Sequence, residues 1–144
     1  MKTAFLLLVT ILAIAMSTAC GQADAGAPPG QEVRVDGGSY RDIAPAKLRE
    51  MLEKKDFTLV NVHIPYEGEI TGTDLFVPYN QMEQNITRLP ADKGARIVLY
   101  CRSGSMSTAA SKTLVRLGFT NVWNLTGGMI EWKRQGYPLA STAK

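Results

Sequence analysis

The sequence predicts an α/β domain with a mostly parallel central sheet. Strand-like and helix-like segments alternate between residues 41 and 136, a pattern typical of parallel strands joined by crossover helices. Residues 96–100 (RIVLY) form a nearly continuous apolar run, as expected of a central strand buried on both faces. A chain of 144 residues with 45% hydrophobic content has room for one such domain and little more.

Each element is predicted from its own local pattern. The first helix has Pro45 in its first turn, and its apolar residues then recur at helical spacing among charged ones. A later helical pattern is closed by Gly118 at the position of a C-cap. The expected elements are, in order, a helix at 45–52, strands at 58–62 and 75–77, a weak helix at 81–89, a strand at 96–100, a helix at 106–117, a strand at 122–125 and a helix at 127–136.

The N-terminal segment is predicted to be a signal peptide. Lys2 precedes an uncharged, apolar run at 4–16, which is shorter than the roughly 20 residues that span a bilayer. The sequence around Cys20 (STACG) resembles a bacterial lipobox. We therefore expect residues 1–20 to form the signal, Cys20 to carry a lipid, and the domain to be exported and anchored to the membrane on the periplasmic side of the cell envelope. The alternative is ordinary cleavage after Ala19 or downstream, which exports the domain without an anchor.

The two cysteines are expected to have different fates. Residues 21–32 (GQADAGAPPGQE) are rich in Gly, Ala and Pro and predict a flexible tether, so that the domain comprises residues 33–144. With Cys20 lipidated or removed, Cys101 is the single thiol of the domain, and no internal disulfide can form. A single thiol is either a buried small hydrophobe or a working nucleophile.

Charge and composition exclude two classes of site. The formal net charge is +3, and the Lys and Arg residues are scattered rather than gathered on one stretch, which argues against nucleic-acid binding. His63 is the only histidine, and the domain has no second thiol, so a metal site built on His or Cys is not expected. No other cofactor is expected.

The position of Cys101 favours the nucleophile. It directly follows the most hydrophobic predicted strand, and residues 102–105 lead into a helix. Ligands of open α/β sheets bind at the carboxyl ends of the strands, and successive N–H groups at a helix N-terminus form an anion-binding nest. We expect the thiol at the rim of this nest, where positive potential favours a thiolate or a persulfide. The alternative is a buried structural cysteine.

Several motifs together resemble the rhodanese family. Residues 101–107 (CRSGSMS) resemble its active-site loop, Cys-Arg-Ser-Gly-x-Arg-Ser. Residues 125–138 resemble its C-terminal signature, Leu-x-Gly-Gly-x-x-x-Trp-x-x-x-Gly-x-Pro, and residues 60–72 resemble its upstream strand and turn. These motifs occur in order across residues 40–139. The resemblance implies a rhodanese-like fold, with a central mostly parallel sheet flanked by helices on both faces, and sulfur transfer through a persulfide.

The resemblance also implies which residues form the site. Cys101 is the expected nucleophile, and its loop binds the substrate through Arg102, Ser103, Gly104, Ser105 and Met106. The chain departs from the family pattern at four positions: the family's Asp, Arg and His are replaced upstream of the loop, and its second loop Arg is Met106. Because Met106 removes a cation, we expect weak use of dianionic thiosulfate and better use of polysulfides or persulfides. The three upstream replacements are Asn61, His63 and Glu69.

Several side chains near these motifs have less specific expectations. His63 is either a polar neighbour of the pocket or a surface residue at the end of a strand. Glu67 and Glu69 are expected to be solvated loop carboxylates, and Trp123 and Trp132 are expected to belong to the core.

Three functions compete at this stage. In a sulfurtransferase, Cys101 takes sulfur from a small donor and passes it to cyanide or to a thiol acceptor. A non-catalytic module of the same fold binds or senses sulfur species. A Cys-based phosphatase or arsenate reductase requires an Arg that closes the loop, and Ser107 occupies that position. The expected partners are therefore small sulfur compounds, a thiol acceptor, and a membrane through the lipid anchor.

Overall fold

The computed structural model describes residues 30–140, so the predicted signal peptide, Cys20 and most of the predicted tether lie outside the described residues. No helix within residues 30–140 is long and apolar enough to cross a membrane. The main sheet has six strands in the order β1-β2-β7-β6-β3-β5. Its members are β1 (Gln31–Val35), β2 (Gly38–Ile43), β7 (Val122–Leu125), β6 (Ile97–Tyr100), β3 (Thr58–Asn61) and β5 (Leu75–Phe76).

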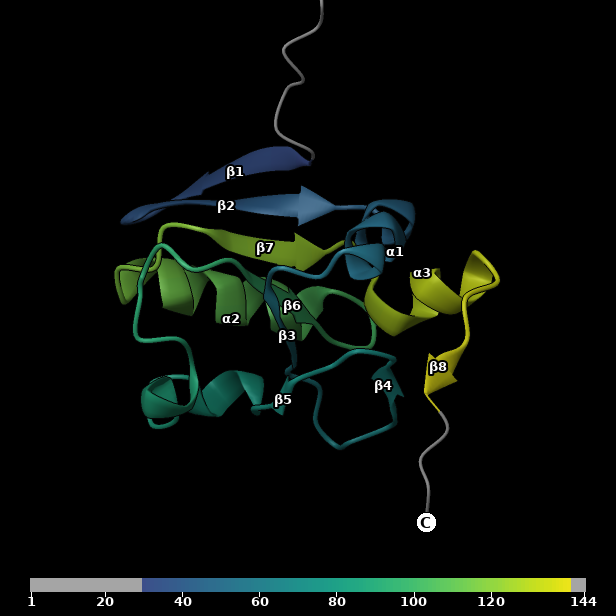
Figure 1. Cartoon of the computed structure of the whole chain (residues 1–144). Helices are drawn as coiled ribbons and strands as arrows, with labels where there is room; N and C mark the ends of the chain where they lie inside the picture. Colours follow the sequence, from purple (N-terminus) through teal and green to yellow (C-terminus); the bar gives the residue numbers. More distant parts are fainter. Residues whose placement is uncertain (1–29, 141–144) are drawn as a thin grey trace, which may run out of the picture.

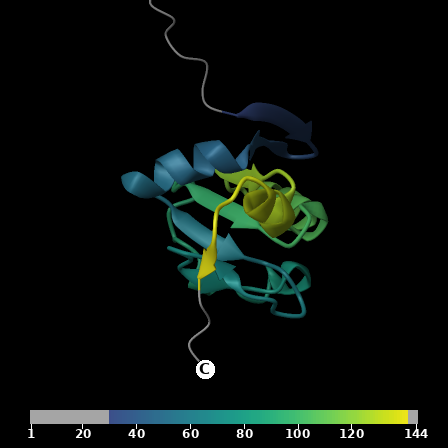
Figure 2. The same cartoon turned by 90° about the vertical axis from the view of Figure 1, so that its right-hand side faces the viewer.

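All neighbouring strands of the main sheet are parallel except β1 and β2, which form an antiparallel hairpin. Helix α2 (Ser105–Arg116) covers one face, and α1 (Pro45–Glu53) and α3 (Gly128–Arg134) cover the other (Figures 1 and 2). The predicted α/β fold with a mostly parallel sheet between two helical layers is therefore confirmed.

The central strand β6 shows why two helical layers are needed. All four of its side chains are buried, and they alternate between two clusters. Ile97 and Leu99 pack on the α2 face, whereas Val98 and Tyr100 pack on the face of α1 and α3. The expected core positions of Trp123 and Trp132 are also confirmed, because both side chains are buried in the second cluster.

The hairpin at the start of the domain was not predicted. Most of the side chains of β1 are exposed, so it lacks the alternation that marks a half-buried strand. Gln31 and Glu32, expected in the tether, belong to this strand. A second, two-stranded sheet formed by β4 (Glu69–Ile70) and β8 (Leu139–Ala140) was also missed, because strands of two residues carry no periodicity.

The predicted helix at 81–89 is wrong. Two short 3₁₀ turns, η1 (Tyr79–Gln81) and η2 (Ile86–Arg88), occupy this region. The side-chain amide of Asn85 donates to the carbonyl of Gln81 at 2.9 Å, beside the backbone N–H of the same residue at 3.1 Å. Such local side-chain bonds compete with continuous helix formation. Met82 and Leu89 alone are buried here, so no apolar stripe supports a longer helix.

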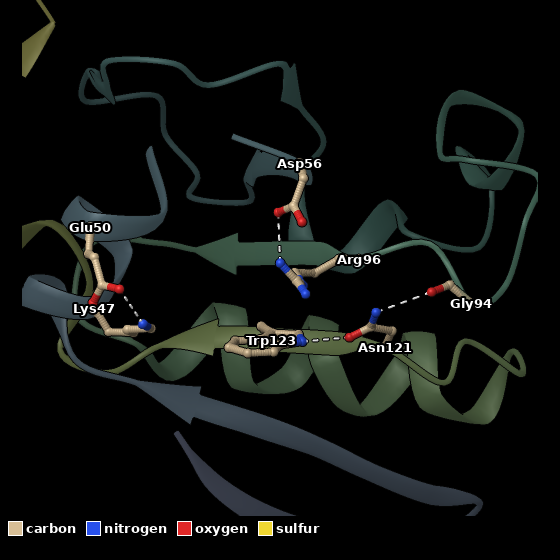
Figure 3. Close-up of polar contacts among 7 residues, drawn as sticks. All are labelled: Lys47, Glu50, Asp56, Gly94, Arg96, Asn121 and Trp123. Atoms are coloured by element: carbon tan, nitrogen blue, oxygen red, sulfur yellow. Dashed lines mark hydrogen bonds and ion pairs between the residues drawn. The ribbon is translucent and has the colours of Figure 1, made fainter. Parts of the chain in front are cut away.

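Polar contacts connect the strands at the amino end of the sheet, opposite the Cys101 loop (Figure 3). Arg96, which precedes β6, donates to Asp56, which precedes β3, at 2.7 Å. The indole N–H of Trp123 donates to Asn121 at 2.6 Å, and the Asn121 amide donates to the Gly94 carbonyl at 3.2 Å. These contacts join the starts of three parallel strands and leave the carboxyl end free for the site.

Tyr100 connects the central strand to the loop that precedes β5. Its hydroxyl accepts a hydrogen bond from the backbone N–H of Ile70 at 2.9 Å and lies 2.8 Å from the Thr73 hydroxyl. Burial raises the pKa of Tyr100 to about 12, because the phenolate would lose its hydration. The buried hydroxyl therefore contributes stability only while it is protonated.

We expect Tyr100→Phe to lower the free energy of unfolding by about 1–3 kcal/mol at neutral pH, because the buried Ile70 N–H loses its partner. The folded pKa lies above the unfolded value near 10, so this contribution is complete below pH 10 and falls as the pH rises toward 12. Urea unfolding from pH 8 to pH 11 should show the two proteins converging in stability. A constant difference across that range would contradict the role of the hydroxyl.

Candidate active site

The loop between β6 and α2 encloses the sulfur of Cys101. The side chain belongs to the α2 face of the sheet, two residues beyond Leu99 on the same face, and it is only 1% exposed. The backbone N–H of Gly104 donates to Sγ at 3.0 Å, and the Ser107 hydroxyl lies 3.6 Å from Sγ. The thiol therefore lies inside the loop, deeper than the predicted position at the rim.

Two glycines allow this loop to close. Gly104 has a φ of +99°, in the left-handed region that favours glycine, and this conformation aims its N–H at the sulfur. Gly128 lies so close to the loop that a Cβ atom there would be 2.2 Å from the Cys101 carbonyl oxygen and 2.8 Å from the Arg102 carbonyl carbon. No residue with a side chain fits at position 128 without moving the loop.

Helix α3 fixes the orientation of the loop backbone. The N–H groups of Met129 and Ile130 donate to the carbonyls of Cys101 and Arg102, both at 2.9 Å. Because trans peptide units carry C=O and N–H on opposite sides, fixing these carbonyls turns the N–H groups of residues 102 and 103 away from α3. The first turn of α3 thus uses N–H groups that have no partner within the helix to hold the backbone of the Cys101 loop.

Acidic and basic side chains meet on the outer side of the loop. The guanidinium Nε of Arg102 lies 3.4 Å from Oε2 of Glu67, and both side chains are substantially exposed, at 58% and 43%. Oε1 of Glu67 lies 3.6 Å from Nε2 of His63. Glu67 is therefore shared between two basic groups, rather than freely solvated as predicted.

His63 is buried, so of the two expectations for this residue, the surface position is wrong. It is 6% exposed, and neither ring nitrogen has a hydrogen-bond partner among residues 30–140. Asn61 fixes the backbone before it: its side-chain oxygen accepts from the His63 N–H at 3.0 Å, and its amide donates to the Gly68 carbonyl at 2.9 Å. A carboxylate could not make the second bond, which gives a physical reason for Asn at this position.

The remaining predicted site residues differ in their surroundings. Met106 is half-buried and packs against the cluster that contains Cys101. Ser103 and Ser105 are exposed, and with Gly104 they border an open hollow of about 380 Å³ beside the loop. A more apolar hollow of about 330 Å³ lies between α1 and α3, and no residue of the Cys101 loop lines it. No cluster of His, Cys, Asp and Glu side chains suited to a metal ion occurs within the described part of the chain.

The comparison with known families agrees with this geometry. The family model of the rhodanese-like domain matches residues 44–135, which is more than half of the chain. This chain belongs to the rhodanese-like domain family. The matched region includes β3, β6, α2 and all of α3, and therefore all the elements that form the Cys101 loop.

Curated relatives of this rhodanese-like domain include sulfurtransferases. It is 32% identical over 96 residues to a sulfurtransferase of Allochromatium vinosum, with 65% of this chain and 87% of the relative covered. It is 31% identical to a probable adenylyltransferase/sulfurtransferase of Mycobacterium tuberculosis and 29% identical to a tRNA uridine(34) hydroxylase of Escherichia coli. These matches cover 67% and 74% of this chain but only 25% and 33% of those longer proteins.

Solved structures support the fold. A rhodanese-related protein from Thermoplasma volcanium matches with a TM-score of 0.61 and 29% identity, covering 70% of this chain and 98% of that one. A rhodanese-like domain protein from Staphylococcus aureus matches with a TM-score of 0.57 and 24% identity, covering 69% of this chain and 98% of that one. At that identity, the second comparison supports the fold alone.

Some residues of the site carried no signal of their role in the sequence. Ser107 was recognised only as a loop position, yet its buried hydroxyl bridges Sγ and the Gly104 carbonyl. The contact between Glu67 and Arg102 joins two loops that are far apart in sequence. The pair Gly127-Gly128 was recognised as a helix start, and the paired glycines were the available sign of a close backbone approach.

We expect Gly128→Ala to destabilise the rhodanese-like domain by more than about 2 kcal/mol and to increase the alkylation rate of Cys101. The new Cβ would collide with backbone atoms of the loop, in addition to about 1–2 kcal/mol of left-handed strain. Gly136→Ala is the matched control, because Gly136 also has a positive φ but nothing within 4 Å of its Cβ position. Urea unfolding and the rate of thiol modification measure both effects. If Gly128→Ala and Gly136→Ala changed the free energy of unfolding and the alkylation rate equally, the close approach of Gly128 would not explain the effect.

Proposed function

We propose that this rhodanese-like domain is a sulfurtransferase that carries sulfane sulfur as a persulfide on Cys101. The observation that carries the proposal is the 3.0 Å hydrogen bond from the Gly104 N–H to Sγ, at the start of α2. A backbone donor and a helix N-terminus both stabilise negative charge, whether on a thiolate or on a persulfide. The sulfurtransferases among its relatives support the same chemistry.

The proposed reaction has two displacement steps. In the first, the Cys101 thiolate attacks the outer sulfur of a donor such as thiosulfate, a sulfur–sulfur bond of the donor breaks, and sulfite leaves with the bonding pair. In the second, cyanide or an acceptor thiolate attacks the outer sulfur of the persulfide, and Cys101 leaves as a thiolate. In both steps the Gly104 N–H and the Ser107 hydroxyl lie beside the sulfur, and residues 102–106 are proposed to bind the substrate.

A phosphatase or arsenate reductase is a weaker explanation of the same loop. Those reactions need a guanidinium to hold a tetrahedral oxyanion with two parallel hydrogen bonds. Ser107 lies near the sulfur where such a residue would be required, and Arg102 is paired with Glu67 outside the loop. A non-catalytic sulfur-binding module of this fold differs from a sulfurtransferase in that Cys101 would not gain a sulfur atom that cyanide removes.

Intact-mass measurement after exposure to thiosulfate, and separately to polysulfide, should show the gain of one sulfur atom that cyanide then removes. Cys101→Ser should prevent both the mass gain and thiocyanate formation while retaining the fold, because Ser is nearly isosteric but cannot hold a persulfide. Persistent activity in the Ser variant would exclude Cys101 as the nucleophile. A wild-type protein that gains no sulfur from either donor would instead favour the non-catalytic module.

The charges beside the loop support a preference among donors. Arg102 is the only cation of the loop, it is already paired with Glu67, and Met106 adds no charge. A dianion such as thiosulfate therefore meets less positive potential than a loop with a second Arg would provide. We propose that polysulfides or persulfides are better donors than thiosulfate.

We expect Glu67→Gln to lower the KM for thiosulfate about two- to fivefold at low ionic strength, because the exposed pair contributes at most about 1 kcal/mol. Glu69→Gln is the matched control, because Glu69 lies two residues further on, at the start of β4, and forms no ion pair with Arg102 in the described structure. Met106→Arg should lower the same KM further, by roughly tenfold or more if the new cation faces the donor, and should steepen its dependence on salt. Unchanged thiosulfate kinetics in Glu67→Gln and Met106→Arg would remove the argument for donor preference.

We also propose that the protein works outside the cytoplasm, held to a membrane by a lipid on Cys20. The lipobox-like sequence and the short apolar run before it support this location. Cys20→Ala should release the protein from the membrane fraction or block its processing, because one lipid-bearing residue would be the anchor. Membrane fractionation of the wild type and the Cys20→Ala variant measures the share of each protein that stays with the membrane. Equal membrane association would contradict the anchor.

A further inference from the structure

A polar hollow lies beside the Cys101 loop, and neither step of the proposed reaction assigns it a ligand. It is an open cavity of about 380 Å³ between the end of β2, the end of β7 and the start of α2. Its lining is rich in oxygen and includes Asp42, Gly104, Ser105, Thr108, Asn124 and Thr126.

The sheet register places this hollow close to the nucleophile. Asp42 on β2 and Leu99 on β6 both lie opposite Asn124 on β7, and Cys101 follows Leu99 on the same face. With strands about 4.8 Å apart and about 3.3 Å per residue, the Cα atoms of Asn124 and Cys101 are about 8 Å apart. Gly104 forms a direct link, because it lines the hollow and donates its N–H to Sγ.

The polar groups in the wall of the hollow favour a cationic ligand. The Asn124 amide donates to the Asp42 carboxylate at 2.7 Å and to the Thr108 hydroxyl at 3.3 Å. Asn124 is only 3% exposed, and its side-chain oxygen has no hydrogen-bond partner in the described part of the chain. The Asn124 oxygen is covered, so the group in the wall that a ligand can neutralise is the Asp42 carboxylate, and a ligand with several N–H donors can also reach the hydroxyl groups around it.

Neighbouring charges agree with this assignment. Burial raises the pKa of Tyr40, and the negative charge of the nearby Asp42 carboxylate raises it further. An anionic sulfur donor would be repelled here, so the hollow does not suit thiosulfate. A hydrogen-bonded carboxylate that lines the same hollow as Gly104 of the Cys101 loop suits the ammonium group of an acceptor.

We propose that this hollow binds the ammonium group of a small aminothiol that accepts sulfur from Cys101. This inference rests on the proposed sulfurtransferase function. The ammonium group binds at the Asp42 carboxylate, which the Asn124 amide holds in place, and the acceptor thiolate attacks the outer sulfur of the persulfide. A bond forms between the acceptor sulfur and the outer sulfur, the bond to Sγ breaks, Cys101 leaves as a thiolate, and the acceptor thiol has released its proton to solvent.

The test separates loading from transfer. The protein is first loaded with polysulfide, freed of excess reagent and checked by intact mass. Loss of the added sulfur is then timed with cysteamine and with 2-mercaptoethanol, which carries a hydroxyl group in place of the ammonium group. Asp42→Asn should lower the ratio of the cysteamine rate to the mercaptoethanol rate about fivefold, and the ratio cancels the intrinsic reactivities of the two thiols.

Two controls complete the experiment. Asp36→Asn makes the same chemical change on the exposed turn of the same hairpin and should leave the ratio unchanged. The second control uses the sulfur-loaded wild-type protein. Here 2-(methylthio)ethylamine cannot accept sulfur but should compete with cysteamine for the hollow, whereas 2-(methylthio)ethanol should not compete. Equal ratios in the wild type and Asp42→Asn, or no competition by the amine, would overturn the inference. Failure to load sulfur would overturn the sulfurtransferase function and this inference with it.

Discussion

The close approach of Gly128 to the backbone of Cys101 and Arg102 is the constraint on which the site depends. It brings the first N–H groups of α3 within 2.9 Å of the two loop carbonyls, and a side chain at this position would separate them. The loop does not determine its own shape, because a helix from another part of the chain fixes its peptide planes. The Cys101 loop and the helix that orients it are thus separate in sequence and are joined by backbone hydrogen bonds.

The sequence could predict the central elements because their patterns are local. The apolar run of β6, the helical spacing of α2 and the position of Cys101 between them need no knowledge of distant residues. The hairpin of β1 and β2 was missed because an exposed edge shows little periodicity. The region around Asn85 was predicted wrongly because side-chain bonds to the backbone compete with a helix. The burial of His63 and the pairing of Glu67 depend on tertiary contacts that no local pattern records.

The two sides of the nucleophile loop differ in charge. On one side, the cation of Arg102 faces Glu67 and lies largely in solvent. On the other side, Asp42 and Asn124 form a partly buried acceptor surface next to Gly104. An anionic donor and a cationic acceptor would therefore favour different sides of one sulfur atom. In the proposed reaction, this polarity would let the domain distinguish the two half-reactions without a change in its fold.

The near-complete burial of Cys101 also affects how the resting protein meets oxidants. Peroxides convert accessible thiolates to sulfenic acids and then to sulfinic and sulfonic acids, and the last forms are not restored by thiols. A persulfide adds one sulfur atom about 2 Å beyond Sγ. In the proposed cycle, the persulfide would carry its outer sulfur beyond the thiol position that the loop covers, whereas the empty protein keeps its thiol covered. Under the proposed function, the packing that holds the loop closed would also protect the Cys101 thiol from oxidation between reaction cycles.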